Sequence, residues 1–340
     1  MSPGKSYRLK WKLIVLSTIA SVALFSVFYE VYKRNQYEKW KADYKNEGNW
    51  YGTLTVASSN PRLMWEYRPY GKYVNGKKGY TIITNRYGLR GLDRDLSLKQ
   101  PFKKRIAFLG DSATLGLFVN DEETFVRKFE DHAAGQCSNV AVESVNCAVD
   151  GYHTLQLLEL LKTKVVTFSP DSVVYVMHLN DFDFEFSAGD KFLYFQKPRN
   201  FLLNDIRNAL WPVFYDYYDY SFDRHKEDVF NAITEMSALL RERNIEFSVA
   251  LLPTFVMIHP NFKNYPHWEL HQRVGEFLVK EKIRFLDLAL RFNDLNLSPA
   301  TIGIDVWHLN PKGHDTVARQ MIPFVLQKEC SGAGTTNSGL

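Results

Sequence analysis

The sequence has little cysteine, no strong excess of either charge and no internal repeat. Its three cysteines do not have the spacing of a metal site. The net charge is only +4, and the lysines and arginines are scattered along the chain, which excludes the basic stripe expected of a nucleic-acid-binding protein. Without a repeat, the sequence does not predict a solenoid or a propeller.

What is present is a globular composition together with one long hydrophobic run. The 340 residues are 45% hydrophobic and 24% charged, which suits one large domain with attachments. Aromatic residues make up 15% of the chain, and a disproportionate share of them falls in residues 182–220. These features direct attention to the N-terminus and to that aromatic region.

The hydrophobic run covers residues 13–29 and contains no charged side chain. It is close to the shortest length at which a helix spans a bilayer. Basic residues precede it, as in a signal sequence, but Phe28, Tyr29 and Tyr32 stand where a small-residue cleavage site would follow. We therefore predict an uncleaved transmembrane anchor in residues 1–37, with aromatic side chains at the interface. The alternative is a buried helix of a soluble domain.

The charges that flank this run bear on its orientation in a membrane. The short basic N-terminus favours a main domain outside the cytoplasm, on the periplasmic side. Lys33, Arg34, Lys39 and Lys41 follow the run closely and reduce the charge asymmetry. The predicted localisation is a single-pass membrane protein with an extracytoplasmic domain.

Residues 38–100 are predicted to form a linker and a β-hairpin extension, with a polar tether over residues 31–60. The segment YGKYVNGKKGYTIITN has two strand-like runs around Asn75, Gly76 and Gly79, which is typical of a hairpin. The segment TNRYGLRG then leads into the main domain, residues 101–330. Residues 331–340 are of low complexity and are predicted to be disordered.

Strand-like and helix-like segments alternate through the main domain. Such alternation predicts a doubly wound parallel sheet that is covered by helices on both faces. In these sheets, ligands bind beyond the carboxyl ends of the strands. The expected strands are residues 105–109, 141–146, 172–177, 246–252 and 283–288, and the expected helices are residues 123–134, 153–165, 227–243, 266–281 and 311–328.

Polar residues or glycines follow several of the expected strands. Gly110, Asp111 and Ser112 come directly after the first strand, and Gly151 lies in the loop after the second. Asn180 and Asp181 follow the third strand, and the segment DVWH, from Asp305 to His308, precedes the last helix. All of these positions fall at the rim where a ligand is expected.

The side chains at this rim are complementary in their chemistry. A serine hydroxyl such as that of Ser112 is a weak nucleophile unless a base accepts its proton, and His308 is a candidate base. Asp305 is close enough in sequence to accept the Nδ1 proton of His308 and so leave Nε2 for the serine. The backbone N–H groups of Ser112 and Gly151 and the side-chain amide of Asn180 are candidate oxyanion donors.

Each motif also has a plain structural interpretation. Ser112 could belong to an ordinary turn, Asn180 and Asp181 to a second turn, and the Asp305–His308 loop could cap a helix. The four motifs are specific only together, because they occur in order and each lies at a predicted strand end or in a loop before a helix.

This ordered set resembles the SGNH, or GDSL, hydrolase family over residues 105–328. The resemblance implies a three-layer α/β/α, flavodoxin-like fold and acyl-ester hydrolysis or acyl transfer, with no metal and no cofactor. It implies Ser112 as nucleophile, His308 as base, Asp305 as its orienting carboxylate, and Gly151 and Asn180 as oxyanion donors. One position departs from the family pattern, because His178 stands where the third motif has glycine, and it could line the pocket. The preceding WEYRP and TNRYGLRG segments look like the extension of membrane-anchored bacterial members.

Structural roles are favoured over metal binding or catalysis for several other residues. His267 and His271 lie four residues apart on an expected helix, but a third metal ligand is missing, so a surface or core pair is favoured. Asp111 and Asp181 are interpreted as supports for their turns, and Cys147 as a small buried residue.

Two cysteines lie at the ends of helices that can share one face of the sheet. Cys137 is expected at the end of the first helix and Cys330 at the end of the last, so their C-terminal ends can meet. We predict a Cys137–Cys330 disulfide, in keeping with an extracytoplasmic domain.

The aromatic region, residues 182–225, reads as an insertion after the third strand. Long insertions at a ligand-binding rim are often lids or binding loops. The alternatives are a satellite packing module and a second contact with the membrane surface.

Together these features predict a membrane-anchored serine esterase or O-acyltransferase of a bacterial cell envelope. The expected partners are a carbohydrate or lipid acyl ester as substrate and the membrane through the N-terminal helix, without nucleic acid. Two other classes remain open: a non-catalytic envelope protein that keeps the fold for binding, and a membrane-tethered scaffold.

Overall fold

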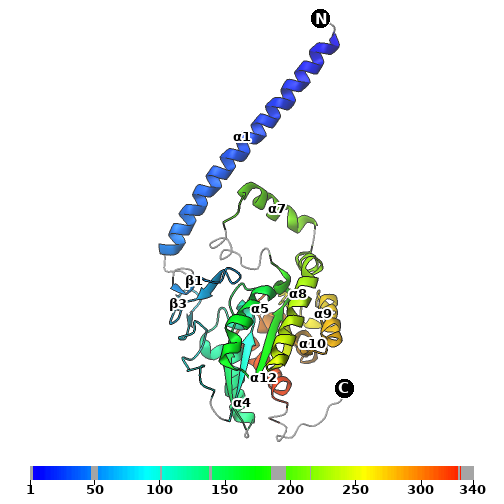
Figure 1. Cartoon of the computed structure of the whole chain (residues 1–340). Coiled ribbons are helices and arrows are strands. Elements are labelled where there is room, and N and C mark those ends of the chain that lie inside the picture. The colour runs from blue at the N-terminus through cyan, green and yellow to red at the C-terminus, as the bar shows by residue number, and fades with distance from the viewer. Residues whose placement is uncertain are drawn as a thin grey trace.

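The computed structural model of the chain describes residues 3–46, 53–99, 102–137, 140–184, 197–214, 216–327 and 330 (Figure 1). The predicted tail, residues 331–340, and the middle of the predicted insertion, residues 185–196, lie outside the described residues. The domain boundaries expected from the sequence stay a prediction.

The main domain is built on a five-stranded sheet in which every neighbouring pair of strands is parallel. The order β6-β5-β7-β8-β9 is the doubly wound order of flavodoxin-like folds. The predicted parallel sheet is therefore confirmed. Its strands are β5 (Lys103–Leu109), β6 (Ala141–Asn146), β7 (Ser172–His178), β8 (Glu246–Leu252) and β9 (Arg284–Asp287).

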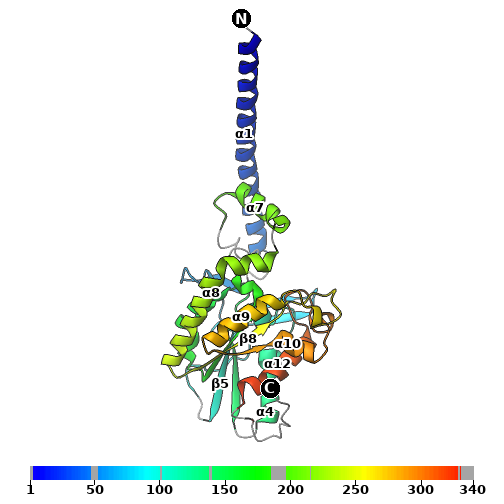
Figure 2. The same cartoon turned by 90° about the vertical axis from the view of Figure 1, so that its right-hand side faces the viewer.

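Helices cover both faces of this sheet and produce three layers (Figure 2). Successive residues of a strand point to opposite faces, so Ile106 and Phe108 join one hydrophobic cluster while Ala107 and Leu109 join the other. A strand buried on both faces is apolar throughout, which explains the uninterrupted run at the end of β5. One layer holds α4 (Phe125–Gln136), α10 (Leu288–Asp294) and α12 (Pro311–Val325), and the other holds α5 (Thr154–Thr163), α8 (Tyr217–Glu242) and α9 (Trp268–Lys280).

Helices α8 and α10 differ from the sequence-based expectation for the main domain. Helix α8 begins ten residues before the predicted start, inside the aromatic insertion, because Asp216 caps it by accepting hydrogen bonds from the N–H groups of Tyr218 and Asp219. Helix α10 was not predicted, because it follows β9 without a connecting loop. The short helices are α3 (Ser112–Leu115), α11 (Pro299–Ile302), η1 (Asp121–Glu123), η2 (Val165–Phe168), η3 (Leu179–Phe182) and η4 (Phe262–Asn264).

The N-terminus forms one continuous helix, α1 (Pro3–Asn46), that projects from the domain (Figure 1). The expected polar tether is therefore wrong for residues 31–46, because helical structure continues through them. Segment Lys10–Ala42 is long and apolar enough to cross a membrane, and its most apolar window is not buried inside the protein. Leu24 and Phe28 are each 72% exposed, which speaks against the alternative of a buried core helix.

Two antiparallel hairpins form the extension before the main domain. The predicted hairpin is confirmed as β3 (Lys72–Asn75) paired with β4 (Tyr80–Ile83). A second hairpin pairs β1 (Thr55–Ala57), near the end of the segment expected to be a tether, with β2 (Trp65–Tyr67), which lies beyond that segment. The extension packs on the main domain, where Gln156 of α5 donates a hydrogen bond to the carbonyl of Leu63 at 3.0 Å.

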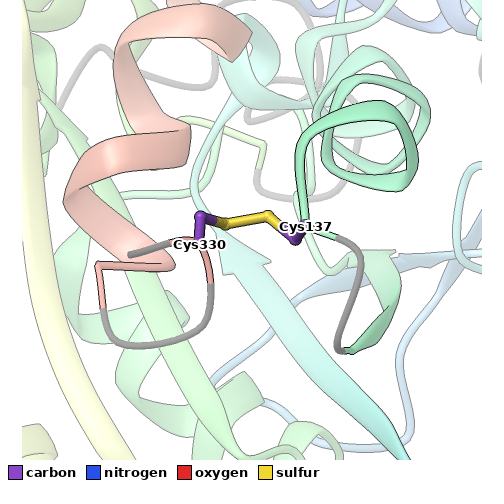
Figure 3. Close-up of a disulfide and its surroundings, with 2 residues drawn as sticks. All are labelled: Cys137 and Cys330. Atoms are coloured by element: carbon purple, nitrogen blue, oxygen red, sulfur yellow. A yellow bond between two sulfur atoms is a disulfide. The ribbon is translucent and has the colours of Figure 1, made fainter. Parts of the chain in front are cut away.

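The structure confirms the predicted Cys137–Cys330 disulfide (Figure 3). It joins the C-terminal end of α4 to the segment that follows α12 and closes 193 residues of chain between them. The third cysteine, Cys147, is free and buried.

Candidate active site

The serine of interest lies where β5 ends and α3 begins, beside the switch point between β5 and β7. Gly110 is required at this turn, because an added Cβ would lie 2.3 Å from Oγ1 of Thr114 and 3.0 Å from the carbonyl of Val176. Asp111 caps α3 by accepting a hydrogen bond from the N–H of Ala113 at 2.9 Å. Ser112 is then the first residue of the helix and is almost fully buried.

The structure brings Ser112 together with the two residues of the DVWH segment that the sequence predicted. The distance from Nε2 of His308 to Oγ of Ser112 is 2.9 Å. On the other side of the ring, Nδ1 of His308 lies 2.9 and 2.8 Å from the two carboxylate oxygens of Asp305. With the Nδ1 proton held by the carboxylate, Nε2 presents its lone pair to the serine hydroxyl.

Asp305 is ionised in this arrangement. Partial burial opposes its ionisation, but the hydrogen bond from His308, the charge of that ring and the backbone N–H groups of Trp307 and His308 together hold the pKa of the carboxyl below its usual range. The resulting carboxylate fixes the His308 ring and stabilises it when it gains a proton.

The loop that carries His308 is fastened to the domain on two sides. Ile304 donates a hydrogen bond to the carbonyl of His308 at 2.8 Å, and Phe255 donates one to the carbonyl of Val306 at 2.8 Å. The ring of Phe118 meets the His308 ring edge to face, with centroids 4.9 Å apart. These contacts restrict the imidazole to an orientation that reaches Ser112.

The side-chain amide of Asn180 is held in one orientation. Its Nδ2 donates to Oδ2 of Asp111 at 3.0 Å, and its Oδ1 lies 2.8 Å from Nδ1 of His178. The amide nitrogen has two hydrogens, so one N–H remains for a ligand at the rim. Asp111 therefore supports its own turn, as interpreted from the sequence, and also orients the side chain of Asn180.

The expectation that His178 lines the pocket is not met. Its side chain is buried with 1% of its surface exposed, and burial lowers its pKa to about 4, although nearby Asp111 acts in the opposite direction. A neutral ring with the proton on Nδ1 donates to Oδ1 of Asn180. Histidine at this position therefore orients the asparagine amide from beneath.

Gly151 lies in a turn beside the nucleophile segment. Its φ of +77° is a backbone conformation that favours glycine, and Tyr152 donates across the turn to the carbonyl of Val149. The turn is tied to the serine segment because Val149 donates to the carbonyl of Gly110 at 3.1 Å. The role of the Gly151 N–H as an oxyanion donor stays a prediction.

Asp181 is fully buried under the rim, where it braces the turn after β7. One carboxylate oxygen accepts hydrogen bonds from the hydroxyl of Tyr175 at 2.8 Å and from the N–H of His178 at 3.0 Å. Burial, together with the charge of Asp111, raises the pKa of the Asp181 carboxyl well above its usual range. The protonated form is therefore favoured in the folded chain.

An Asp181→Asn variant tests this protonation state. Because the folded pKa lies above the unfolded value of 3.8, the wild type loses stability as the pH rises through that value, by up to about 1.4 kcal/mol per pH unit. Asparagine does not titrate, so the variant should gain stability relative to wild type as the pH rises above the unfolded value of 3.8, measured by urea unfolding at a series of pH values. The control is Asp228→Asn, on the exposed side of α8, which removes a carboxylate that is not buried. A relative stability independent of pH would contradict the protonated state.

The two histidines weighed as metal ligands have separate surroundings. His271 is buried, with Nδ1 3.0 Å from Asp287 and Nε2 3.2 Å from the hydroxyl of Tyr265. The ring of His267 packs against that of Tyr218, with centroids 4.6 Å apart. Since both nitrogens of His271 are engaged, the pair does not form an open two-ligand face, in agreement with the core-pair interpretation.

Arg90, in the TNRYGLRG segment, is a contributor that the sequence did not single out. Its guanidinium is buried and donates to the carbonyls of Leu115 at 3.0 Å, Gly116 at 2.6 Å and Val119 at 2.6 Å. These three carbonyls lie at the end of α3 and in the loop that follows it, and that loop also carries Phe118. Arg90 thus connects the N-terminal extension to the segment that supports Ser112 and His308.

The start of α8 also reaches the site, from within the predicted aromatic insertion. The indole N–H of Trp307 donates to the hydroxyl of Tyr218 at 2.7 Å. Trp307 is the neighbour of His308 and is 40% exposed. Trp307 and Tyr218 therefore form an aromatic wall next to the candidate base. The density of aromatic residues in the sequence did not indicate which of them lie there.

Comparisons with known proteins were made against family models, curated proteins and solved structures. No family model and no curated protein matches the chain. The chain is similar to an acetyl xylan esterase, AlAXEase, at 16% identity over 65% of this chain and 99% of that one, with a TM-score of 0.44. It is similar to the acetylxylan esterase Axe2 of Geobacillus stearothermophilus at 14% identity over 64% and 92%, with a TM-score of 0.44. A GDSL-family lipolytic protein of Desulfitobacterium hafniense matches at 14% identity over 64% and 96%, with a TM-score of 0.40.

These identities and TM-scores are low, so the assignment of the fold rests on this chain's own strand order and packing. Both faces of the parallel sheet are covered, and the order of the strands is that of the flavodoxin-like folds. The chain therefore has the three-layer α/β/α fold that its resemblance to the SGNH hydrolases implied.

Proposed function

We propose that the chain is a membrane-anchored serine esterase in which Ser112 is the nucleophile, His308 the general base and Asp305 its orienting carboxylate. The observation that carries the proposal is the unbroken chain of contacts from Asp305 through His308 to Ser112, at 2.8 and 2.9 Å. A structural serine or a helix-capping aspartate does not require all three groups in line.

In the proposed mechanism, Oγ of Ser112 attacks the ester carbonyl carbon while Nε2 of His308 takes its proton. The carbonyl π electrons move to oxygen, where the free N–H of Asn180 and the backbone N–H groups of Ser112 and Gly151 are the proposed donors. Collapse of the intermediate breaks the ester C–O bond, and His308 returns the proton to the leaving alcohol. Water then attacks the acyl carbon while His308 takes a water proton. The bond between that carbon and Oγ breaks, His308 returns the proton to Oγ, and the acid is released from a regenerated Ser112.

The proposed setting is the extracytoplasmic side of a bacterial membrane, with a carbohydrate or lipid acyl ester as substrate. The exposed apolar surface of α1 supports an anchor. The Cys137–Cys330 disulfide supports an oxidising compartment, since such bonds are rare in the cytoplasm. Transfer of the acyl group to an alcohol uses the same acyl-serine and differs only in the second acceptor.

The proposal is tested by covalent trapping. A fluorophosphonate, which reacts with activated serines, should add one phosphonyl group to the wild-type chain, and peptide mass mapping should locate it at Ser112. His308→Ala should remain unlabelled, because the hydroxyl then lacks its base. Turnover of p-nitrophenyl esters of increasing chain length, with and without an alcohol acceptor, then separates hydrolysis from transfer. A wild type that is neither labelled nor active would favour a scaffold.

Removal of the Asn180 amide should lower kcat. Asn180→Ala removes a donor that is useful only when negative charge develops on the substrate oxygen, so kcat should fall about 10²- to 10³-fold with a small change in KM. Asn231→Ala, on the exposed side of α8, is the matched control and should retain wild-type kinetics. An increase in KM alone would assign Asn180 to ground-state binding.

A further inference from the structure

Helix α7 (Phe201–Phe214), which belongs to the aromatic insertion, lies against α1, between the projecting part of α1 and the main domain (Figures 1 and 2). The two helices are joined by specific contacts. Asp205 of α7 accepts a hydrogen bond from Tyr29 at 2.7 Å and pairs with Lys33 at 2.7 Å. Glu30 accepts the N–H of Leu202, a donor that the first turn of a helix leaves free.

These contacts give α7 a defined depth along α1. The uncharged run of α1, residues 13–29, is about 26 Å long as a helix, close to the thickness of a bilayer's hydrocarbon core. Asp205 lies level with Tyr29 and Lys33, where that run ends, and Phe201 packs against Tyr37, further from it. Helix α7 therefore approaches the level of the hydrocarbon from Phe201 to Asp205.

The side of α7 turned away from α1 is apolar and exposed. Leu203, Ile206 and Leu210, at i, i+3 and i+7, share one face of the helix and are 65%, 45% and 51% exposed. Phe201 and Asp205, which meet α1, fall on the opposite face. Arg207 lies beside the apolar face, where a long cationic side chain can reach the headgroups.

We infer that α7 lies in the lipid headgroup layer as a second membrane contact, with Leu203, Ile206 and Leu210 directed into the acyl boundary. This inference rests on the proposed anchor, which sets the bilayer at residues 13–29. Moving these three apolar side chains from water into the acyl boundary is favourable, because apolar surface is removed from water. This exposed apolar face lies at the same level as the membrane-proximal end of the spanning helix, so lipid is the nearest apolar phase that can cover it.

This position has a consequence for the substrate. Phe214, the end of α7, is only four positions along the chain from Tyr218, which contacts Trp307 next to His308. Four residues of chain span at most about 14 Å. The rim that carries Ser112 is therefore held close to the membrane surface, where it is suited to acyl esters in or at the bilayer.

The inference is tested with environment-sensitive NBD labels on single introduced cysteines in the full chain, reconstituted in phosphatidylcholine vesicles. Cys147 is buried and Cys137 is bonded to Cys330, so the introduced thiol is the one that reacts. Brominated phosphatidylcholine quenches labels that reach the acyl region. Labels at Ala20→Cys and Ile206→Cys should lose emission, and a label at Asn231→Cys on α8 should not.

The outcomes separate this inference from the proposed anchor. Quenching at Ala20 without quenching at Ile206 would leave the anchor in place and overturn the role of α7, as would burial of this face against a second copy of the chain. Quenching at neither position would overturn both. As a second readout, Ile206→Asp should reduce turnover of a vesicle-embedded long-chain ester several-fold and leave turnover of soluble p-nitrophenyl acetate unchanged. Equal effects on both substrates would contradict the inference.

Discussion

The Ser112→Ala variant is expected to lose about 10⁴- to 10⁶-fold in kcat on p-nitrophenyl acetate while it keeps its fold. The hydroxyl is the proposed attacking group, and alanine has no atom that can form the acyl intermediate. His308→Ala should lose a comparable factor, because an unassisted hydroxyl is a poor nucleophile at neutral pH. Steady-state kinetics and circular dichroism of the two variants provide the measurement.

The double variant sharpens this prediction. Since Ser112 and His308 act as a unit, at 2.9 Å from each other, the Ser112→Ala/His308→Ala chain should be no slower than either single variant. Ser237→Ala, on α8, serves as the control and should behave as wild type. Losses that multiply in the double variant would show that the two residues act independently and would remove the basis for the proposed mechanism.

Replacing Arg90 with methionine is expected to lower both stability and activity. The guanidinium donates to three carbonyls at the end of α3 and in the loop that follows, at 3.0 Å or less, and methionine has no donor to replace these bonds. The carbonyls of Leu115 and Gly116 keep a second donor in Asn146 and Val119, whereas that of Val119 loses its partner. A buried carbonyl without a partner costs about 1–3 kcal/mol, so the free energy of unfolding should fall by about that amount. Because the same loop places Phe118 against His308, kcat should fall in the fraction that remains folded.

Arg86→Met is the matched control from the same segment. Arg86 forms an exposed ion pair with Asp93 at 2.9 Å, and such surface pairs contribute little to stability because solvent screens them. Urea unfolding and kcat, measured side by side, should therefore separate Arg90 from Arg86. If the Arg90→Met chain had a wild-type kcat at urea concentrations below its unfolding midpoint, Arg90 would contribute to stability only and would not position His308.

Some features of the site could be predicted because their signals are local in the sequence. The β5 run from Arg105 to Leu109 is apolar because both of its faces are buried, and Gly110 follows because a Cβ does not fit beside Thr114. Asp305 precedes His308 by three residues, and one loop is enough to bring the carboxylate to the ring. Each of these patterns is complete within a few residues.

Other features had no comparable signal. His178 suggested a pocket-lining residue, yet it holds Asn180 from below, because the amide also needs Asp111, which lies 69 residues earlier in the chain. Arg90 could not be told from any other arginine in the sequence. Its partners are main-chain carbonyls, which every residue has, so no particular residue type marks them. The depth of α7 similarly depends on contacts with α1 that lie more than 160 residues apart in sequence.

The sequence by itself determined the positions and the parallel direction of the sheet strands, the apolar N-terminal helix and the residue types at the rim. These follow from hydrophobic periodicity and short motifs, which the chain encodes over a few neighbouring residues. The tertiary structure alone decided which groups orient the candidate catalytic side chains, that the extension clamps the loop after α3, and where α7 lies along α1. Those outcomes depend on hydrogen bonds and packing between distant segments, and their geometry exists only once the chain has folded.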